Sequence, residues 1–187
     1  MSDFQERAAA YIDRLEELHA KDFRIQRDVE QSGYEFPLRV SYRNDDRRYL
    51  LGIRGSIGTD SLCSEYCFFT AWETLTADKL EEYFTACNTI RDELTEQRHP
   101  GHQFTMIGLV VCTEHFPKPL QRKLRRHTDI KRYKTDGTGW SEIRICVVDL
   151  ADETIYPNAD GESLKNRLTQ GVPERHTGFF ARLLGLD

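Results

Sequence analysis

The sequence lacks any long apolar run. None of the hydrophobic stretches in its 187 residues approaches the ~20 residues that a helix needs to cross a bilayer. The first eighteen residues, MSDFQERAAAYIDRLEEL, carry Asp and Glu where a secretory signal carries basic residues. There is no internal repeat with a period of about 20–50 residues and no low-complexity tract. We therefore expect a folded cytoplasmic protein with no membrane partner.

The sequence also lacks the pattern of a disulfide framework. The five cysteines are odd in number, and Cys67, Cys87, Cys112 and Cys146 lie inside apolar segments. A reduced thiol packs like a small apolar group, so burial explains these positions better than disulfide bonds do. Cys112 precedes His115 by three residues, and a Cys–His pair can form a reactive thiolate. A simple packing role is the interpretation that we favour.

The spacing of a zinc site is absent as well. His99 and His102 form one pair, and Cys112 and His115 form another. If the segment between the pairs is an extended strand, they stand about 30 Å apart, too far to share one ion. Acidic loops such as 149–153 offer oxygen ligands for cations, but solvated turns have the same composition. We expect no metal and no cofactor.

Apolar residues recur along the chain at two different periods. Spacings of three and four predict amphipathic helices, whereas alternation predicts strands. Ser2 and Thr76 stand where N-caps of helices are expected, and Pro117 and Pro119 open a short helix. We expect helices at 3–20, from 77 to the break at 99–101, for about ten residues from 117, and at 160–168. We expect strands at 23–29, 36–42, 48–53, 66–72, 104–112, 130–133, 140–150 and 153–156.

This order of elements predicts the fold class α/β (α+β), with the order α-β-β-β-α-β-α-β. A mixed central sheet of about five to seven strands with helices on both faces is the natural packing. The most apolar segments, YCFFTAW at 66–72 and FTMIGLVVC at 104–112, have apolar side chains on both faces. They therefore predict neighbouring strands in the middle of the sheet. The length suits one domain over 1–172.

The chain ends in an apolar tail, residues 173–187. Five large apolar side chains lie within eight residues of it, and alone they would expose too much apolar surface to water. We expect the tail to dock on its own domain or on a partner. A homodimer formed through the tail or an edge strand is one such arrangement.

Positive charge is concentrated in one segment. Eight of the seventeen residues in 118–134 are Lys or Arg, and the only acid is Asp129. The rest of the chain keeps 18 basic against 30 acidic residues, a formal net charge of −12. Such a stripe can neutralise phosphates, with Tyr133 or Trp140 stacking on a base. The alternative is a solvated helix whose charges pair with the acidic remainder or a twin subunit. The candidate nucleic-acid-binding residues are Arg122, Lys123, Arg125, Arg126, Lys131, Arg132 and Lys134.

The order of elements over about residues 3–127 resembles the core of the restriction-endonuclease-like (PD-(D/E)xK) superfamily. Cleaving members carry an acid near the second core strand, and a Glu or Asp, one residue and then Lys on the third. The resemblance implies that these groups hold a divalent metal and assist the attacking water. Here the third strand ends in CFFTAWETL, with Glu73 but Leu75 two positions later. The resemblance implies a displaced catalytic set of Asp60, Glu73 and Lys79, with Mg²⁺ as its cofactor. The alternative that we favour is that these residues serve a turn and the start of a helix.

Three functions follow from these patterns. The first is a non-catalytic α/β domain that acts in protein interaction. The second is a nucleic-acid-binding protein that uses the basic segment 118–134, and the third is a divergent metal-dependent nuclease. The glycine-rich segment 54–59 lacks the Gly-Lys-Ser/Thr ending of a phosphate loop and the glycine pattern of a dinucleotide site, so we interpret it as a connection. Gly55, Ser56 and Gly58 could still bind a small anion, and the sequence leaves any small-molecule ligand unknown.

Overall fold

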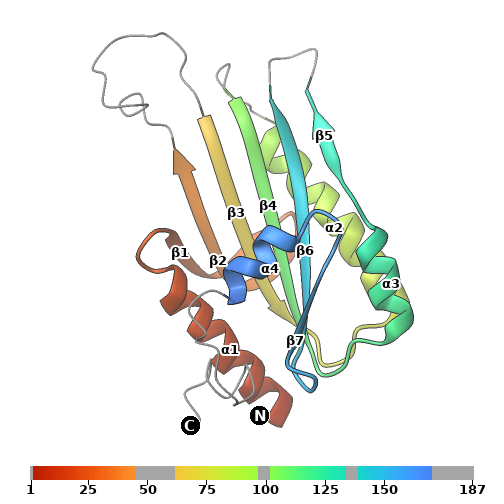
Figure 1. Cartoon of the computed structure of the whole chain (residues 1–187). Helices are drawn as coiled ribbons and strands as arrows, with labels where there is room; N and C mark the ends of the chain where they lie inside the picture. Colours follow the sequence, from red (N-terminus) through yellow and green to blue (C-terminus); the bar gives the residue numbers. More distant parts are fainter. Residues whose placement is uncertain (1, 45–61, 97–101, 134–138, 170–187) are drawn as a thin grey trace.

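The computed structural model describes residues 2–44, 62–96, 102–133 and 139–169. In these ranges a seven-stranded mixed sheet has helices on both faces (Figure 1), as the sequence predicted. The strand order is β1-β2-β3-β4-β6-β5, and β7 also pairs with β6. The helices are α1 (Asp3–His19), α2 (Ala77–Thr95), α3 (Lys118–Arg126) and α4 (Glu162–Thr169). The strands are β1 (Arg24–Gln31), β2 (Tyr34–Asn44), β3 (Leu62–Ala71), β4 (His102–Thr113), β5 (Ile130–Arg132), β6 (Trp140–Asp149) and β7 (Thr154–Pro157).

The sheet combines an antiparallel half with a parallel half. β1, β2 and β3 are antiparallel neighbours, and β1 turns into β2 through Ser32 and Gly33, which have φ values of 54° and 77°. Two successive positive φ values are what a tight hairpin turn requires. β3, β4 and β6 are mutually parallel. The predicted strand 48–53 and the apolar tail 173–187 lie outside the described residues.

The two most apolar segments are neighbouring central strands, which confirms the prediction made from them. Residues 63–71 of β3 pair in parallel with residues 104–112 of β4, and β4 pairs with β6 on its other side. Side chains alternate between two cores. Val110 and Cys112 lie in the core that α1 and α4 cover, while Leu109 and Val111 lie in the core that α2 and α3 cover.

Two helix caps identified in the sequence are present in the structure. The Ser2 hydroxyl accepts a hydrogen bond from the Gln5 backbone N–H at 3.3 Å, and the Gln5 side chain accepts one from the Ser2 N–H at 3.0 Å. The Thr76 hydroxyl accepts from the Lys79 N–H at 3.3 Å. Each cap satisfies donors that have no partner within the helix. No helix in the described ranges is long and apolar enough to cross a membrane.

The contact between α4 and the sheet depends on Gly108 of β4. A Cβ atom added there would lie 2.9 Å from Cys67 Sγ and 3.1 Å from Leu164 Cδ2. Both neighbours are buried, so neither can move aside freely. The absence of a side chain at this position therefore lets α4 approach the middle of the sheet.

We expect Gly108→Ala to destabilise the fold by about 1–3 kcal/mol, because an extra methyl group overpacks this contact. The direction of the change in unfolding free energy is informative, because replacing Gly with Ala within a strand otherwise stabilises the folded protein. Chemical denaturation would give the free energy of unfolding. In a Cys67→Ala background the penalty should shrink, and an equal penalty in both backgrounds would contradict this account.

Two histidines should make stability depend on pH. Burial lowers the pKa of His19 and of His127 below the ordinary 6.5. In the unfolded chain both regain their ordinary pKa, so acidification protonates the unfolded state first. The melting temperature should fall as the pH drops from about 7 to about 5. In the double variant His19→Phe, His127→Phe this slope should flatten, and an unchanged slope would refute the assignment.

Candidate functional site

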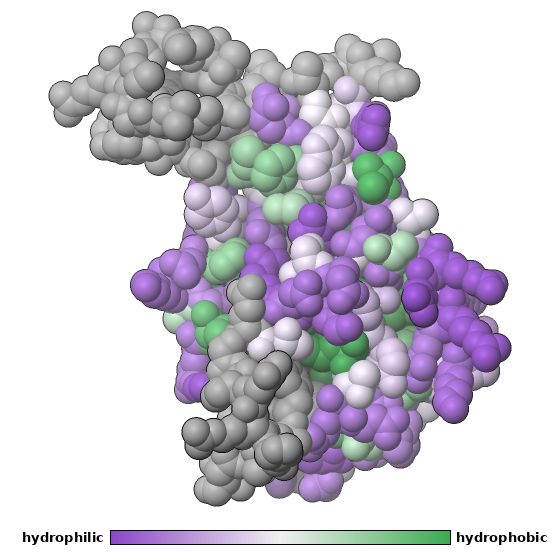
Figure 2. All heavy atoms as spheres, viewed as in Figure 1, coloured by the Kyte–Doolittle hydropathy of each residue, from purple (hydrophilic) through white to green (hydrophobic). Residues whose placement is uncertain are grey.

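The basic segment forms the outer surface of α3 and the strand after it. Pro117 precedes the helix, and Leu124 is fully buried against α2 and the sheet. With 3.6 residues per turn, positions two residues from Leu124 point away from the core. Arg122, Arg125 and Arg126 are all exposed to solvent. Figure 2 shows strongly hydrophilic side chains projecting from the flank of the molecule where α3 lies in Figure 1.

The structure divides the predicted basic residues into two groups. Lys123 forms an ion pair with Glu81 of α2, and Lys131 forms one with Asp92 at 2.7 Å. Their charges are therefore partly neutralised within the protein. Within the described ranges, no ion pair involves the four exposed arginines, Arg122, Arg125, Arg126 and Arg132. Lys134 lies outside the described residues.

The single acid of the segment does not neutralise these arginines. Asp129 forms an ion pair with Arg91 of α2, and the Arg91 side chain is only 8% exposed. The second nitrogen of that guanidinium donates to Asn88 Oδ1 at 2.6 Å. The negative charge of Asp129 is thus held in a largely buried pair beneath the basic surface. The arginines around it keep their positive field.

A groove of about 750 Å³ runs beside the basic helix, between α3, the edge strand β7 and the start of α4. Gln121, Arg122 and Arg125 line it from α3, Tyr156 lines it from β7, and Lys165 lines it from α4. Glu162 also faces the groove, but it pairs with Lys165 at 3.4 Å. Net positive charge therefore comes from the α3 side.

The end of α3 is tied to the end of β7 by a network of hydrogen bonds. The Asn158 side chain is buried, and its Nδ2 donates to the backbone oxygens of His127 and Ile143, each at 3.2 Å. Its Oδ1 accepts from the Ile145 N–H at 2.9 Å, and the Ala159 N–H donates to the His127 oxygen at 3.1 Å. The two sides of the groove are thus held at a fixed separation.

The aromatic residues predicted to stack on bases are engaged within the fold. The Tyr133 hydroxyl donates to Thr95 Oγ1 at 3.0 Å and lies 2.8 Å from Ser141 Oγ. The Trp140 ring stacks on Phe104, with the centroids 5.4 Å apart. Tyr156 is the aromatic residue that lines the groove, and sequence analysis missed this role. Its signal is only an aromatic residue in a short edge strand, about thirty positions after the basic helix.

The set implied by the nuclease resemblance is partly described. Asp60 lies outside the described residues. Glu73 is exposed beyond the end of β3, and its backbone oxygen accepts hydrogen bonds from the Thr113 hydroxyl and the Glu114 N–H. Lys79 Nζ donates to the Thr74 backbone oxygen at 3.3 Å. These contacts are those of a strand end and a helix entry, and the catalytic set stays a prediction.

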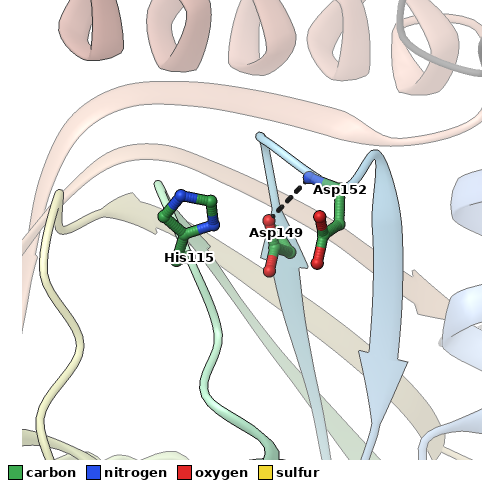
Figure 3. A group of neighbouring side chains, drawn as sticks. All are labelled: His115, Asp149 and Asp152. Atoms are coloured by element: carbon green, nitrogen blue, oxygen red, sulfur yellow. Dashed lines mark hydrogen bonds between the residues drawn. The ribbon is translucent and has the colours of Figure 1, made fainter.

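Three potential metal ligands meet where β4 and β6 end (Figure 3). One ligand atom each of His115, Asp149 and Asp152 lies within 4.8 Å of the others. Buried Asp149 already accepts three backbone hydrogen bonds, from Phe116 at 2.8 Å, Ala151 at 3.1 Å and Asp152 at 2.9 Å. His115 and Asp152 are exposed. The backbone turns around Asp149 use its carboxylate as a hydrogen-bond acceptor, and this role explains the cluster without a bound ion.

The buried thiols have the chemistry of packing groups. All five cysteines are free, and burial raises the pKa of the Cys67 thiol to about 12. Burial also raises the pKa of Cys112 well above its ordinary value. A nucleophilic cysteine needs the opposite shift, because the thiolate is the reactive form. Cys112 lies in the core beneath α1, whereas His115 is exposed.

One family model matches most of the chain. The model of a family described as a domain of unknown function, DUF8052, matches residues 7–170, which include α2–α4 and all seven strands. No curated protein and no solved structure matches. The family description names no substrate or partner, so the function has to be argued from the surface itself.

We expect Asp149→Ala to destabilise the protein by about 3 kcal/mol, since it leaves buried backbone N–H groups without an acceptor. His115→Ala should leave the free energy of unfolding within about 0.5 kcal/mol of the original, as for other exposed side chains. Chemical denaturation with and without a chelator would check both statements. A chelator effect that disappears in His115→Ala would show that the cluster holds an ion.

Proposed function

The chain belongs to the DUF8052 family, and we propose that it is a non-catalytic α/β domain that binds nucleic acid through the basic surface of α3. The observation that carries the proposal is the presence of four exposed arginines that form no ion pair with a described residue, in a protein of formal net charge −5. A solvated helix that balances its own protein would pair these charges, as Lys123 and Lys131 are paired.

Arginine is the side chain suited to this role. Its planar guanidinium donates two parallel hydrogen bonds to a phosphate and keeps its charge at any physiological pH. Each phosphate neutralised releases condensed counterions, which supplies most of the affinity and makes it depend on salt. On α3, Arg122 and Arg125 are three positions apart and Arg122 and Arg126 four, so they form one continuous patch.

The described part of the chain offers less support for an apolar protein interface. Its large exposed hydrophobic residues are Leu18 of α1, Tyr42 of β2 and Ile130 of β5, which come from three different elements. The tail and a homodimer remain sequence-based hypotheses. The basic patch is the more specific surface. We therefore combine the non-catalytic role of the first sequence-based hypothesis with the nucleic-acid ligand of the second.

The triple variant Arg122→Ala, Arg125→Ala, Arg126→Ala should weaken binding to a generic oligonucleotide by roughly ten- to a hundredfold at about 100 mM salt. Fluorescence anisotropy across a salt series would measure it. The slope of log affinity against log salt should also decrease by about 2 units, because three phosphate contacts are lost.

A charge-matched control separates the patch from the net charge. The variant Arg14→Ala, Lys21→Ala, Arg24→Ala removes three exposed positive charges from α1, the turn after it and β1, at the other end of the sheet from α3. It should keep most of the affinity. Equal losses in both triple variants would mean that total charge alone governs binding, and no binding by the original protein at about 50 mM salt would refute the proposed function.

A further inference from the structure

We infer that the groove between α3 and β7 receives an unpaired base, so that this domain prefers single-stranded to double-stranded nucleic acid. The inference rests on the proposed function and names its ligand more narrowly. It comes from the combination of one aromatic side chain and two arginines along the same groove.

Tyr156 supplies a fixed aromatic surface. The strand places it on the α3 side of the sheet, where its ring packs against Phe116 with centroids 5.6 Å apart. The ring is half-buried and lines the groove. Its hydroxyl has no hydrogen-bond partner among the described residues, so the fold does not use its polar end. Stacking of a base on an aromatic ring is favourable and tolerates any base.

Arg122 and Arg125 lie on the α3 side of the same groove. A base that stacks on Tyr156 brings its neighbouring phosphates within reach of side chains of this length. Gln121 also lines this wall, although its Nε2 already donates to the Phe116 backbone oxygen at 2.6 Å. An aromatic ring beside basic side chains in one groove is the arrangement by which proteins bind single-stranded nucleic acid.

The size of the groove agrees with a nucleotide. Its volume of about 750 Å³ lies within the ~300–1,000 Å³ of sites that hold small organic ligands. A duplex keeps its bases stacked inside, so it can offer this groove only its backbone. Single strands, loops and ends present unstacked bases that can enter such a site.

An acidic peptide added to the edge of β7 is the competing ligand. Strand addition draws its affinity from a row of free backbone groups. β7 has only four residues, and its last, Pro157, has no N–H to donate. The Ala159 N–H beyond it already bonds to His127. This edge offers a peptide few partners, whereas the groove offers an aromatic ring and positive charge.

The test compares a labelled single strand of about twelve nucleotides with the duplex of the same sequence, by fluorescence anisotropy at about 50 mM salt. The original protein should bind the single strand more tightly. Tyr156→Leu keeps apolar packing against Phe116 but removes the aromatic face. It should weaken single-strand binding about tenfold and change duplex binding less than about twofold. Tyr156→Phe should bind as the original does, because the hydroxyl has no partner.

Each outcome has a definite meaning. If Tyr156→Leu leaves single-strand affinity unchanged, or if the original binds the duplex equally well, the inference fails. The proposed function survives in that case if the Arg122, Arg125, Arg126 variant still loses affinity. If the original binds polyglutamate but no oligonucleotide, both proposals fail and an acidic protein is the ligand.

A second measurement does not depend on a variant folding. A single strand containing a photoreactive uridine analogue is cross-linked to the unmodified protein, and the labelled peptides are identified by mass spectrometry. Cross-links should fall on the peptides that contain Tyr156 and Arg122 to Arg126. Cross-links confined to other elements would overturn the assignment of the groove. Circular dichroism of each variant shows whether the fold is retained.

Discussion

The fold depends on the parallel pairing of β3, β4 and β6, three strands whose carboxyl-terminal halves are buried on both faces. Removing this much apolar surface from water is the dominant favourable term in folding, and each fully buried large side chain contributes about 1.5–3 kcal/mol. The elements around the candidate site are positioned by these strands. α3 follows the end of β4, and the edge strands β5 and β7 both pair with β6. Close contact at Gly108 then brings α4 onto the opposite face.

The carboxyl ends of the parallel strands are where open α/β sheets most often bind ligands. In this chain backbone hydrogen bonds and an ion pair join the segments at that edge. The Trp72, Glu114 and Leu150 N–H groups donate to backbone oxygens of the neighbouring segments, and Arg7 of α1 forms an ion pair with Glu114 at 2.6 Å. Asp149 is saturated by backbone donors. The proposed binding surface lies instead at the side of the sheet, between α3 and β7.

Local patterns in the sequence were sufficient for the fold class, because strands 66–72 and 104–112 and the caps at Ser2 and Thr76 are determined by nearby residues. The site was only half predictable. The sequence identifies the basic residues, but whether Lys123 is neutralised depends on Glu81 in another helix. Tyr133 was predicted to stack on a base, but in the structure its hydroxyl is hydrogen-bonded to Thr95 and Ser141. Tyr156 joins Arg122 only because β7 returns beside α3. Contacts between segments that are distant in the sequence produce no periodic pattern in it, so they could not be predicted.

The hydrogen bonds of Asn158 have a consequence for recognition. They join the loop after α3 to the end of β7, so hydrogen bonds within the protein hold the backbone on both sides of the groove together without a ligand. Binding to such a preorganised surface spends little free energy on ordering loops, and the affinity of a few contacts is kept. Arginine side chains can adjust to varied backbones while the platform beneath them stays still. For the proposed nucleic-acid ligand, such a surface is suited to sequence-tolerant binding of many strands rather than to the reading of one particular sequence.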